Sequence, residues 1–304
     1  AAYIVEKVSG QSWAEFTRPR IFEPLGMTSA YWDRAPEIAP RLSKSYRNDG
    51  VTEEPYVDIP GKPAGSLNVT PTDLAKFARM MIGRGTHDGV TLLQPESVER
   101  IETPHSTRAT QLGLKLGYGL GNLALPRQKG IFHGHDGGID GFLATYSYEP
   151  THGAGLVAMV NAPKSEALAA MELIVSYLER SWPNREVTKY DQSAELTERL
   201  SGVYQTVAPR IQMLAPLEAL TDWTAVTVAG GKLSIDGSER ILVGPNIFQR
   251  TDRAAPTTVF AIDADGAKML SATGARRQVP QAELLAKAAF VGLYALALLV
   301  SAVF

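Results

Sequence analysis

The chain has 304 residues, 44% of them hydrophobic, with 30 Lys and Arg against 32 Asp and Glu. This composition is that of a globular protein of about two domains, and it excludes a disordered or fibrous one. A formal net charge of −2 gives no electrostatic reason to bind nucleic acid, so no such partner is expected. Because cysteine is absent, disulfides and thiolate zinc sites are excluded.

The first 66 residues predict two helices and a long irregular stretch. Residues 1–10 carry apolar side chains at helical spacing. Ser12, followed three residues later by Glu15, is a capping box for a second helix that reaches about Phe22. Residues 28–66 are rich in Pro, Gly and polar side chains, and such an excursion within a compact domain is more often a pocket wall than filler.

Further helices and an antiparallel sheet follow. Thr70 as N-cap and Pro71 at the first position predict a helix with a buried apolar stripe, and Pro95 begins a short one. From residue 118 to 161 the hydrophobic period changes to two, which predicts strands and a hairpin. A helix is expected over 165–181. The order is helices first, then an antiparallel sheet, then a helix over that sheet. This order predicts an α+β fold for residues 1–181.

Past residue 181 the character of the sequence changes. Residues 182–198 read as a polar linker, and the short strand-like runs of 199–275 predict a small β-rich, barrel-like accessory domain. Residues 288–304 contain no charged side chain and show no polar face. We interpret this run as a truncated transmembrane helix, with a C-terminal core helix as the alternative. A helical pattern is already under way at residue 1, and the apolar run stops only at residue 304. We therefore expect the chain to be a piece of a longer protein.

The densest group of reactive side chains is "IFHGHDGGIDGF", residues 131–142. His133 and His135 would project from the same side of a strand, as two metal ligands must. In binuclear zinc hydrolases a His-x-His-x-Asp-His sequence completes the site, but here Asp136 comes one residue too early and Gly138 replaces the last histidine. No metal or other cofactor is therefore expected, since each remaining histidine stands alone: His87, His105 and His152.

Two other chemistries use glycine-rich stretches. The glycines here follow no dinucleotide fingerprint, and a strand rather than a helix comes after them, which disfavours a phosphate loop. Acyl transfer needs backbone N–H donors aimed at an oxyanion, and Gly137 and Gly138 would permit close approach of a substrate. His135 could donate to a substrate carboxylate or move protons. A glycine-rich hairpin entry with a surface histidine explains these residues equally well.

Three blocks of sequence resemble the later half of one family. They are "YIVEKVSGQSWAEFTRPRIFEPLGM", "PAGSLNVTPTDLAKFARMMI" and "FHGHDGGIDGFLATYSYEPTHGAGLVAMVN", and they occur in this order. The family is that of serine β-lactamase-related proteins: class C β-lactamases, D-Ala-D-Ala carboxypeptidases and similar esterases. The resemblance covers residues 1 to about 181. It implies that they are the C-terminal part of a β-lactamase/penicillin-binding-protein-like transpeptidase fold.

In that family a Ser-x-x-Lys supplies the nucleophile and its activating amine, a Tyr-x-Asn handles protons, and a Lys/His-x-Gly strand closes the pocket. The resemblance implies that His135, Asp136 and Gly137 form the last motif in its histidine form. The N–H of Gly138 would be one oxyanion donor. His135, Gly137 and Gly138 are thus the expected catalytic residues. We expect the substrate pocket to be lined by Asp136, Trp32, Tyr46, Tyr56 and Ser66.

The first two motifs are missing from the sequence. No serine is followed three residues later by lysine. The string Tyr46-Arg47-Asn48 comes after the block that should follow the Tyr-x-Asn motif, so we interpret it as unrelated. The chain alone is therefore predicted to be inactive, because without the serine covalent catalysis is lost.

The resemblance implies a fragment of a bacterial serine hydrolase that forms an acyl-enzyme with an ester, peptide or β-lactam. The histidine form of the last motif disfavours efficient β-lactam hydrolysis. We expect a location in the cell envelope, with the catalytic domain outside the cytoplasm and a membrane contact through the C-terminal helix. A non-catalytic binding or scaffolding relative is the main alternative, and a metallohydrolase is a third.

Overall fold

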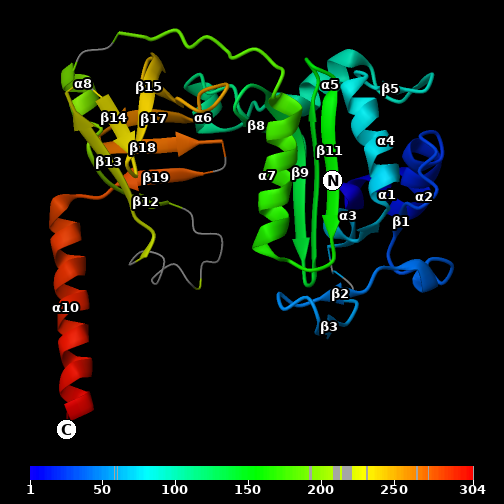
Figure 1. Cartoon of the computed structure of the whole chain (residues 1–304), viewed down its shortest axis with the longest axis horizontal. Coiled ribbons are helices and arrows are strands. Elements are labelled where there is room, and N and C mark those ends of the chain that lie inside the picture. The colour runs from blue at the N-terminus through cyan, green and yellow to red at the C-terminus, as the bar shows by residue number, and fades with distance from the viewer. Residues whose placement is uncertain are drawn as a thin grey trace. The chain divides into compact units, whose positions relative to one another are not determined.

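The computed structural model describes the chain except residues 58, 60, 192–193, 208–212, 214–220, 231, 265, 273 and 304. Within helices, the side chains of 194, 196, 292 and 294–303 also lie outside the description. The chain divides into two compact units (Figure 1). Unit 1 comprises Ala1–Pro104 and Tyr118–Asn184, and unit 2 comprises His105–Gly117 and Arg185–Phe304.

Unit 1 begins with short helical segments whose caps confirm the sequence prediction. Gly10 closes the first helix with a left-handed φ of 70°. Ser12 and Glu15 form a reciprocal capping box at the start of the second. The segments are α1 (Ala2–Ser9), α2 (Trp13–Thr17) and the π-helical turn η1 (Arg18–Phe22).

The described part of residues 28–66 contains only short elements, in keeping with the predicted irregular stretch. Strand β1 pairs with β4, and β2 pairs with β3. The elements are β1 (Tyr31–Trp32), η2 (Ala39–Arg41), β2 (Ser45–Tyr46), β3 (Glu53–Glu54), α3 (Lys62–Gly65) and β4 (Leu67–Asn68).

Helix α4 (Pro71–Ile82) begins at the predicted cap, where the Thr70 hydroxyl accepts the N–H of Asp73. Although burial opposes it, hydrogen bonds from Lys76 and Ser29 keep the pKa of Asp73 below its ordinary value. This carboxylate therefore ties the start of α4 to residue 29. After α4 come β5 (Thr86–His87), β6 (Val90–Thr91) and the predicted short helix α5 (Pro95–Glu102).

A five-stranded antiparallel sheet with the order β11-β10-β9-β8-β7 runs through unit 1. Its register aligns His135 of β9 with Tyr146 of β10, and paired residues point to the same face of a sheet. The Tyr146 ring lies 5.9 Å from that of Phe77, so this face is turned toward α4. The strands are β7 (Gly117–Tyr118), β8 (Leu123–Pro126), β9 (Ile131–Ile139), β10 (Phe142–Glu149) and β11 (Ala154–Val160).

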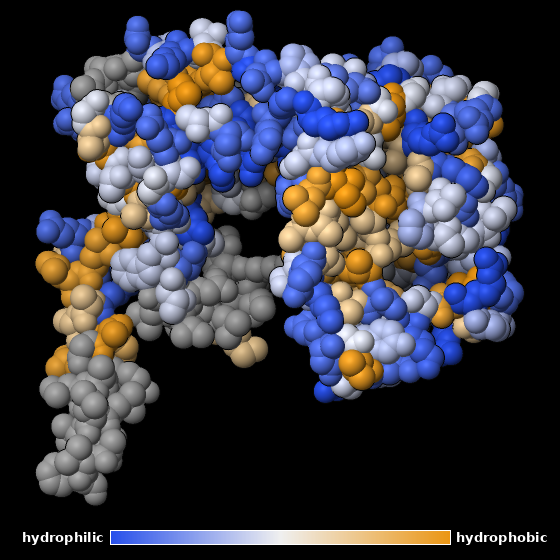
Figure 2. All heavy atoms as spheres, in the orientation of Figure 1, coloured by the Kyte–Doolittle hydropathy of each residue, from blue (hydrophilic) through white to orange (hydrophobic). Residues whose placement is uncertain are grey.

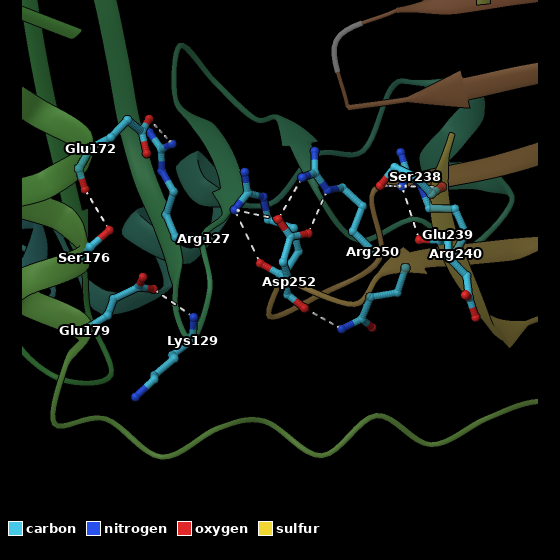
Figure 3. A network of polar contacts seen from close by, with 12 residues as sticks. Arg127, Lys129, Glu172, Ser176, Glu179, Ser238, Glu239, Arg240, Arg250 and Asp252 are labelled. Atoms are coloured by element: carbon cyan, nitrogen blue, oxygen red, sulfur yellow. Dashed lines mark hydrogen bonds and ion pairs between the residues drawn. The ribbon is translucent and has the colours of Figure 1, made fainter. Parts of the chain in front are cut away.

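Helix α7 (Ser165–Glu179) lies over the other face of the sheet. The buried Glu179 carboxylate accepts the N–H of Lys129 at 2.9 Å (Figure 3). It also accepts the N–H of Gly130 at 2.8 Å. Arg127 binds Glu172 at 2.5 Å. Figure 2 shows hydrophobic side chains gathered at the surface over α7 and the neighbouring strands, and on α7 the exposed ones are Leu168, Leu173, Ile174 and Tyr177.

Unit 2 contains a closed antiparallel barrel, into which the short strands predicted over 199–275 are folded. Tyr204, Phe248 and Phe260 meet edge to face in its core, with ring centroids 5.6–5.7 Å apart. The helix α8 (Ala194–Glu198) precedes it. Its strands are β12 (Gly202–Thr206), β13 (Thr224–Ala229), β14 (Lys232–Ile235), β15 (Ser238–Gly244), β16 (Ile247–Arg250), β17 (Thr258–Asp263), β18 (Gly266–Ser271) and β19 (Ala275–Gln278).

Residues 105–117 belong to unit 2 although they precede most of the unit 1 sheet in sequence. They include α6 (Arg108–Gln111). Ala109 and Leu114 are almost fully buried, and they pack with three residues of the barrel, Val259, Ala261 and Leu270. The prediction of one continuous domain over 1–181 did not separate this segment.

Helix α10 (Gln281–Val303) follows the barrel. Hydrogen bonds from Arg277 and Lys287 lower the pKa of Glu283, in its first turn, to about 2. Among the described residues, no helix is both long and apolar enough to span a bilayer. The predicted transmembrane segment at 288–304 is therefore not supported: the described beginning of α10 carries Glu283 and Lys287, and most side chains of the apolar run lie outside the described residues.

Candidate active site

The last five residues of β9 have a neighbouring strand on one side only. Strand β8 pairs with β9 as far as Gly134. Strand β10 continues the pairing to Ile139, the end of β9. Within the described part of the sheet, residues 135–139 therefore form an open edge that carries the glycine-rich motif.

The hydrogen-bond pattern of an antiparallel ladder shows where the main chain of this edge points. The two-residue turn after Ile139 is closed by a hydrogen-bonded pair, and bonded and non-bonded pairs then alternate along the strands. Gly137 and His135 consequently bond toward β10. The N–H of Gly138 points away from β10, toward the open edge, where no described residue outside the sheet accepts its hydrogen bond.

The imidazole of His135 lies at the start of this edge and is exposed. Its Nδ1 is 2.6 Å from the carbonyl oxygen of Asp136, which can only accept, so Nδ1 carries a proton. Nε2 lies 3.5 Å from the hydroxyl of Tyr118, a long contact. The neutral ring therefore offers Nε2 as an acceptor, and the protonated ring would offer it as a donor to a carboxylate.

A buried polar network lies beside β9. The Tyr148 hydroxyl donates to Glu102 and accepts from the Asn122 amide, both at 3.0 Å. Glu102 also binds Arg84 at 2.6 Å. Burial, and next the negative charge of Glu102, raise the pKa of Tyr148 strongly, so its hydroxyl stays protonated. The network links α5 and β10 to Asn122, the residue before β8.

His133 shares the sheet face of His135 but has a different environment. Its ring lies 5.7 Å from that of Tyr148, and its buried Nδ1 has no hydrogen-bond partner among the described residues. Burial lowers the pKa of His133 although the charge of Glu102 opposes this, so the ring is neutral near pH 7. Within the described ranges, no three His, Asp or Glu side chains are grouped to hold a metal ion.

Asp136 does not share the face of His135. Successive residues of a strand point to opposite faces, and Asp136 borders a hollow of about 250 Å³ on the α7 side. Leu143, Leu156 and Val175 also line it. A shallower hollow of about 30 Å³, the size of one water molecule, is bordered by both His135 and Asp136. Neither hollow is bordered by the other predicted pocket residues, Trp32, Tyr46, Tyr56 and Ser66.

Of the four pocket residues predicted in 28–66, Trp32 is a packing residue. Its ring lies 5.9 Å from Trp13 and 6.1 Å from Phe22, and its indole N–H donates to Thr17. These contacts do not test the predicted role of Trp32 in a pocket, which stays a prediction. Tyr46 donates its main-chain N–H to Asn161.

Tyr56 and Ser66 lie near β4. The Asn68 amide donates to the Tyr56 hydroxyl at 3.2 Å. Ser66 is buried, and its hydroxyl oxygen has no partner among the described residues. The described hydrogen bonds and ring contacts of Trp32, Tyr46, Tyr56 and Ser66 do not include His135. The main chain of Tyr46 lies beside Gly141, in the turn after β9. The pocket role of these four residues stays a prediction.

The β-lactamase family matches residues 1–178 of this chain. The chain belongs to the β-lactamase family. It is 28% identical over 150 residues to "Putative beta-lactamase-like 1" of Homo sapiens, covering 47% of this chain and 28% of that protein. It is 30% identical over 115 residues to "Putative penicillin-binding protein PbpX" of Bacillus subtilis, covering 37% and 28%.

The match with "Unguisins hydrolase ungD'" of Aspergillus campestris is longer, at 24% identity over 235 residues, 71% of this chain and 43% of that protein. The chain thus spans less than half the length of these curated relatives. The solved structure of SurE superposes with a TM-score of 0.50 at 19% identity, covering 91% of this chain and 65% of that one. These findings confirm the predicted family and its α+β fold.

Sequence reasoning missed Tyr118 and the buried network. Tyr118 stands in "GYGLG", at the point where the period-two pattern begins, and a tyrosine between glycines at the start of a sheet was the available signal. Glu102 and Asn122 carry no such signal, because their meeting with Tyr148 depends on how α5 packs against the sheet.

Proposed function

We propose that residues 1–178 form part of the acyl-transfer site of a serine hydrolase. The open edge of β9 carries this proposal, because it presents the N–H of Gly138 beside the imidazole of His135. Membership of the β-lactamase family supports it, as does the relative named a hydrolase. In the proposed reaction, a serine hydroxyl attacks the acyl carbon and the Gly138 N–H stabilises the oxyanion. The bond from the acyl carbon to the alcohol oxygen or amine nitrogen then breaks, and that group takes up the proton lost by the serine. Water hydrolyses the acyl-enzyme, which releases the acid and restores the serine hydroxyl.

The nucleophile must come from outside these residues. No Ser-x-x-Lys occurs in the sequence, and the chain spans only 28% of its first relative. We propose that the protein encoded by the complete gene supplies this motif on a further segment. The chain of 304 residues alone then shows no turnover of a chromogenic ester or β-lactam. His135, when protonated, would bind a substrate carboxylate through Nε2.

Replacing Gly138 in the complete protein tests the oxyanion role. Gly138→Pro removes an N–H that makes no ladder hydrogen bond, so the fold should persist. Loss of one oxyanion donor lowers kcat by about 10²–10³. Gly138→Ala is the matched control, because it keeps the N–H and its Cβ would lie 3.4 Å from Leu143, an ordinary contact. A folded proline variant with the kcat of the alanine variant would disprove the role.

A non-catalytic binding relative is the second candidate, favoured by the missing Ser-x-x-Lys. A serine-reactive activity probe separates the two. It labels the complete protein if the hydrolase proposal is right, and a lack of labelling together with binding of an acylated peptide supports the alternative. The substrate class, an ester, a peptide or a β-lactam, and a location outside the cytoplasm remain part of the hydrolase proposal.

A further inference from the structure

We propose that Arg240, Arg250 and Arg253, at one end of the barrel in unit 2, form a binding site for the phosphate group of a small ligand. The proposed hydrolase reaction uses none of these residues, so this site does not depend on it. All the residues concerned lie within unit 2.

Two of the arginines lie on the face of their strands that forms the barrel core. Leu233 of β14 belongs to this core and is 1% exposed, and the register pairs it with Arg240 of β15. Arg240 is in turn paired with Arg250 of β16. Since paired residues point to the same face of a sheet, both arginine side chains start on the core side. Phe248, two residues before Arg250, lies in the same core and agrees with this assignment.

This pairing of two arginines is electrostatically unfavourable. Like charges directly opposite each other on neighbouring strands are destabilising. Burial lowers the pKa of Arg240, and the charge of Arg250 adds to this effect, while the carboxylates of Asp252 and Asp236 oppose it. A guanidinium group nevertheless keeps its charge in proteins. The two opposed charges therefore remain, and a bound anion would stabilise them.

The neighbouring carboxylate neutralises only part of this charge. Asp252 accepts two hydrogen bonds from Arg250, from Nε at 2.8 Å and from Nη2 at 2.7 Å (Figure 3). The Nη1 of Arg253 lies 3.7 Å from the same carboxylate. Arg240 has no ion pair with a described residue. Three guanidinium groups thus share one ion-paired carboxylate among the described residues, which leaves a surplus of two positive charges.

The arginines also keep donors for a ligand. The Nη1 of Arg240 donates to the carbonyl oxygen of Ser238 at 3.0 Å and to its hydroxyl at 2.6 Å, which orients the guanidinium. The Nε of Arg240 is buried and has no partner among the described residues. In Arg250, Nε and Nη2 face Asp252, and Nη1 donates to no described residue. The Nη2 of Arg240 and the Nη1 of Arg250 are therefore the donors that we assign to the ligand.

The charge surplus favours phosphate over carboxylate as the ligand group. The planar guanidinium fork matches the oxygen atoms of both groups. A phosphate monoester carries a charge of about −1.5 to −2 at pH 7, whereas a carboxylate carries a single charge. Only the phosphate balances the surplus in this cluster. A soluble phosphate ester and a lipid headgroup share this chemistry, so the test includes both sources.

Calorimetric titration of the 304-residue chain with glycerol 3-phosphate measures the binding. The ionic strength is held constant, because salt screens exposed charges. Arg240→Gln and Arg250→Gln should each weaken binding by about ten- to a hundredfold, as expected for the loss of a charged hydrogen-bonding partner. Arg199→Gln is the matched control, since it removes the same charge at an exposed position before β12, and it should keep the affinity.

Thermal unfolding separates a ligand site from a merely structural role. Arg240→Gln relieves the repulsion with Arg250, so its Tm without ligand should not fall. The rise in Tm that glycerol 3-phosphate produces in the wild type should be lost in this variant. A lower Tm without ligand, together with no effect of the ester on the wild type, would show that Arg240 only stabilises the barrel. If Arg240→Gln does not fold, Arg240→Lys keeps the charge without the fork and should bind at least severalfold more weakly.

Two further ligands decide the chemical class and the source of the phosphate. Acetate at the same ionic strength should not bind, and acetate binding as tight as that of the ester would overturn the assignment to phosphate. Cosedimentation with phosphatidylcholine vesicles that contain phosphatidic acid, if lost in Arg240→Gln, indicates a lipid headgroup. Binding of the ester alone indicates a soluble ligand. No binding of either, or equal losses in Arg240→Gln and Arg199→Gln, would disprove the site.

Discussion

Replacing Tyr148 by phenylalanine tests whether the polar network under β9 stabilises unit 1. The Tyr148 side chain is fully buried, and its hydroxyl connects the Glu102 carboxylate to the Asn122 amide at 3.0 Å on each side. Phenylalanine keeps the ring and removes both hydrogen bonds. Arg84 remains bound to Glu102, so the carboxylate keeps one partner.

The magnitude follows from what is left unpaired. A hydrogen bond to a charged group contributes about 1.5–3 kcal/mol, and a buried polar group left without a partner costs about 1–3 kcal/mol. Asn122 is the member most affected, because its side chain is buried and its Oδ1 already has no partner among the described residues. With Arg84 offsetting part of the loss at Glu102, we expect the free energy of unfolding to fall by about 3 kcal/mol. For a unit of this size that lowers Tm by about 6–12 °C.

Urea unfolding of the chain, followed by the fluorescence of unit 1 tryptophans, measures this loss. Tyr146→Phe is the matched control, since its ring stacks beside Tyr148 at 6.5 Å and its hydroxyl has no hydrogen-bond partner among the described residues. That control should cost less than about 1 kcal/mol. If both variants lose the same stability, the network contributes nothing beyond the packing of the rings.

Two further outcomes follow from burial and from close packing. Because the pKa of His133 is lowered in the folded state, the unfolded chain binds more protons, so the free energy of unfolding should fall as the pH drops below about 6.5. His133→Gln should flatten that dependence in urea titrations between pH 5 and 8. An unchanged slope would contradict the role of His133. Gly119→Ala should lower the free energy of unfolding in urea by more than about 2 kcal/mol, because its Cβ would lie 2.0 Å from the carbonyl oxygen of Ile101. Gly137→Ala, whose Cβ would lie 3.9 Å from that of Ala144, should unfold like the wild type.

The local signals in the sequence were sufficient for most elements of unit 1. Ser12 with Glu15 and Thr70 with Pro71 mark helix starts that the structure confirms, since capping depends on neighbouring residues alone. The period-two pattern likewise placed β10 and β11. The β-lactamase family followed from three blocks of motif, which need no knowledge of packing.

Long-range packing was not predictable from these signals. The ring of Trp32 packs against those of Trp13 and Phe22, and these contacts depend on how η1 and β1 meet. Residues 105–117 look like ordinary loop sequence. Their place on the barrel depends on apolar contacts with strands some 150 residues later in the chain, and periodicity cannot reveal such contacts.

The face of each motif residue depends on the register of β9, and the turn at its end fixes that register. A slip of one residue would exchange the faces of His135 and Asp136 and would turn the N–H of Gly138 into the ladder. Gly141 prevents the slip: its φ is 77°, and a Cβ there would lie 2.4 Å from the Cβ of Ser45. Only glycine therefore permits both this turn and the close approach of β2. The chemistry proposed for the open edge thus depends on Gly141, which lies after the motif of His135, Asp136 and Gly137.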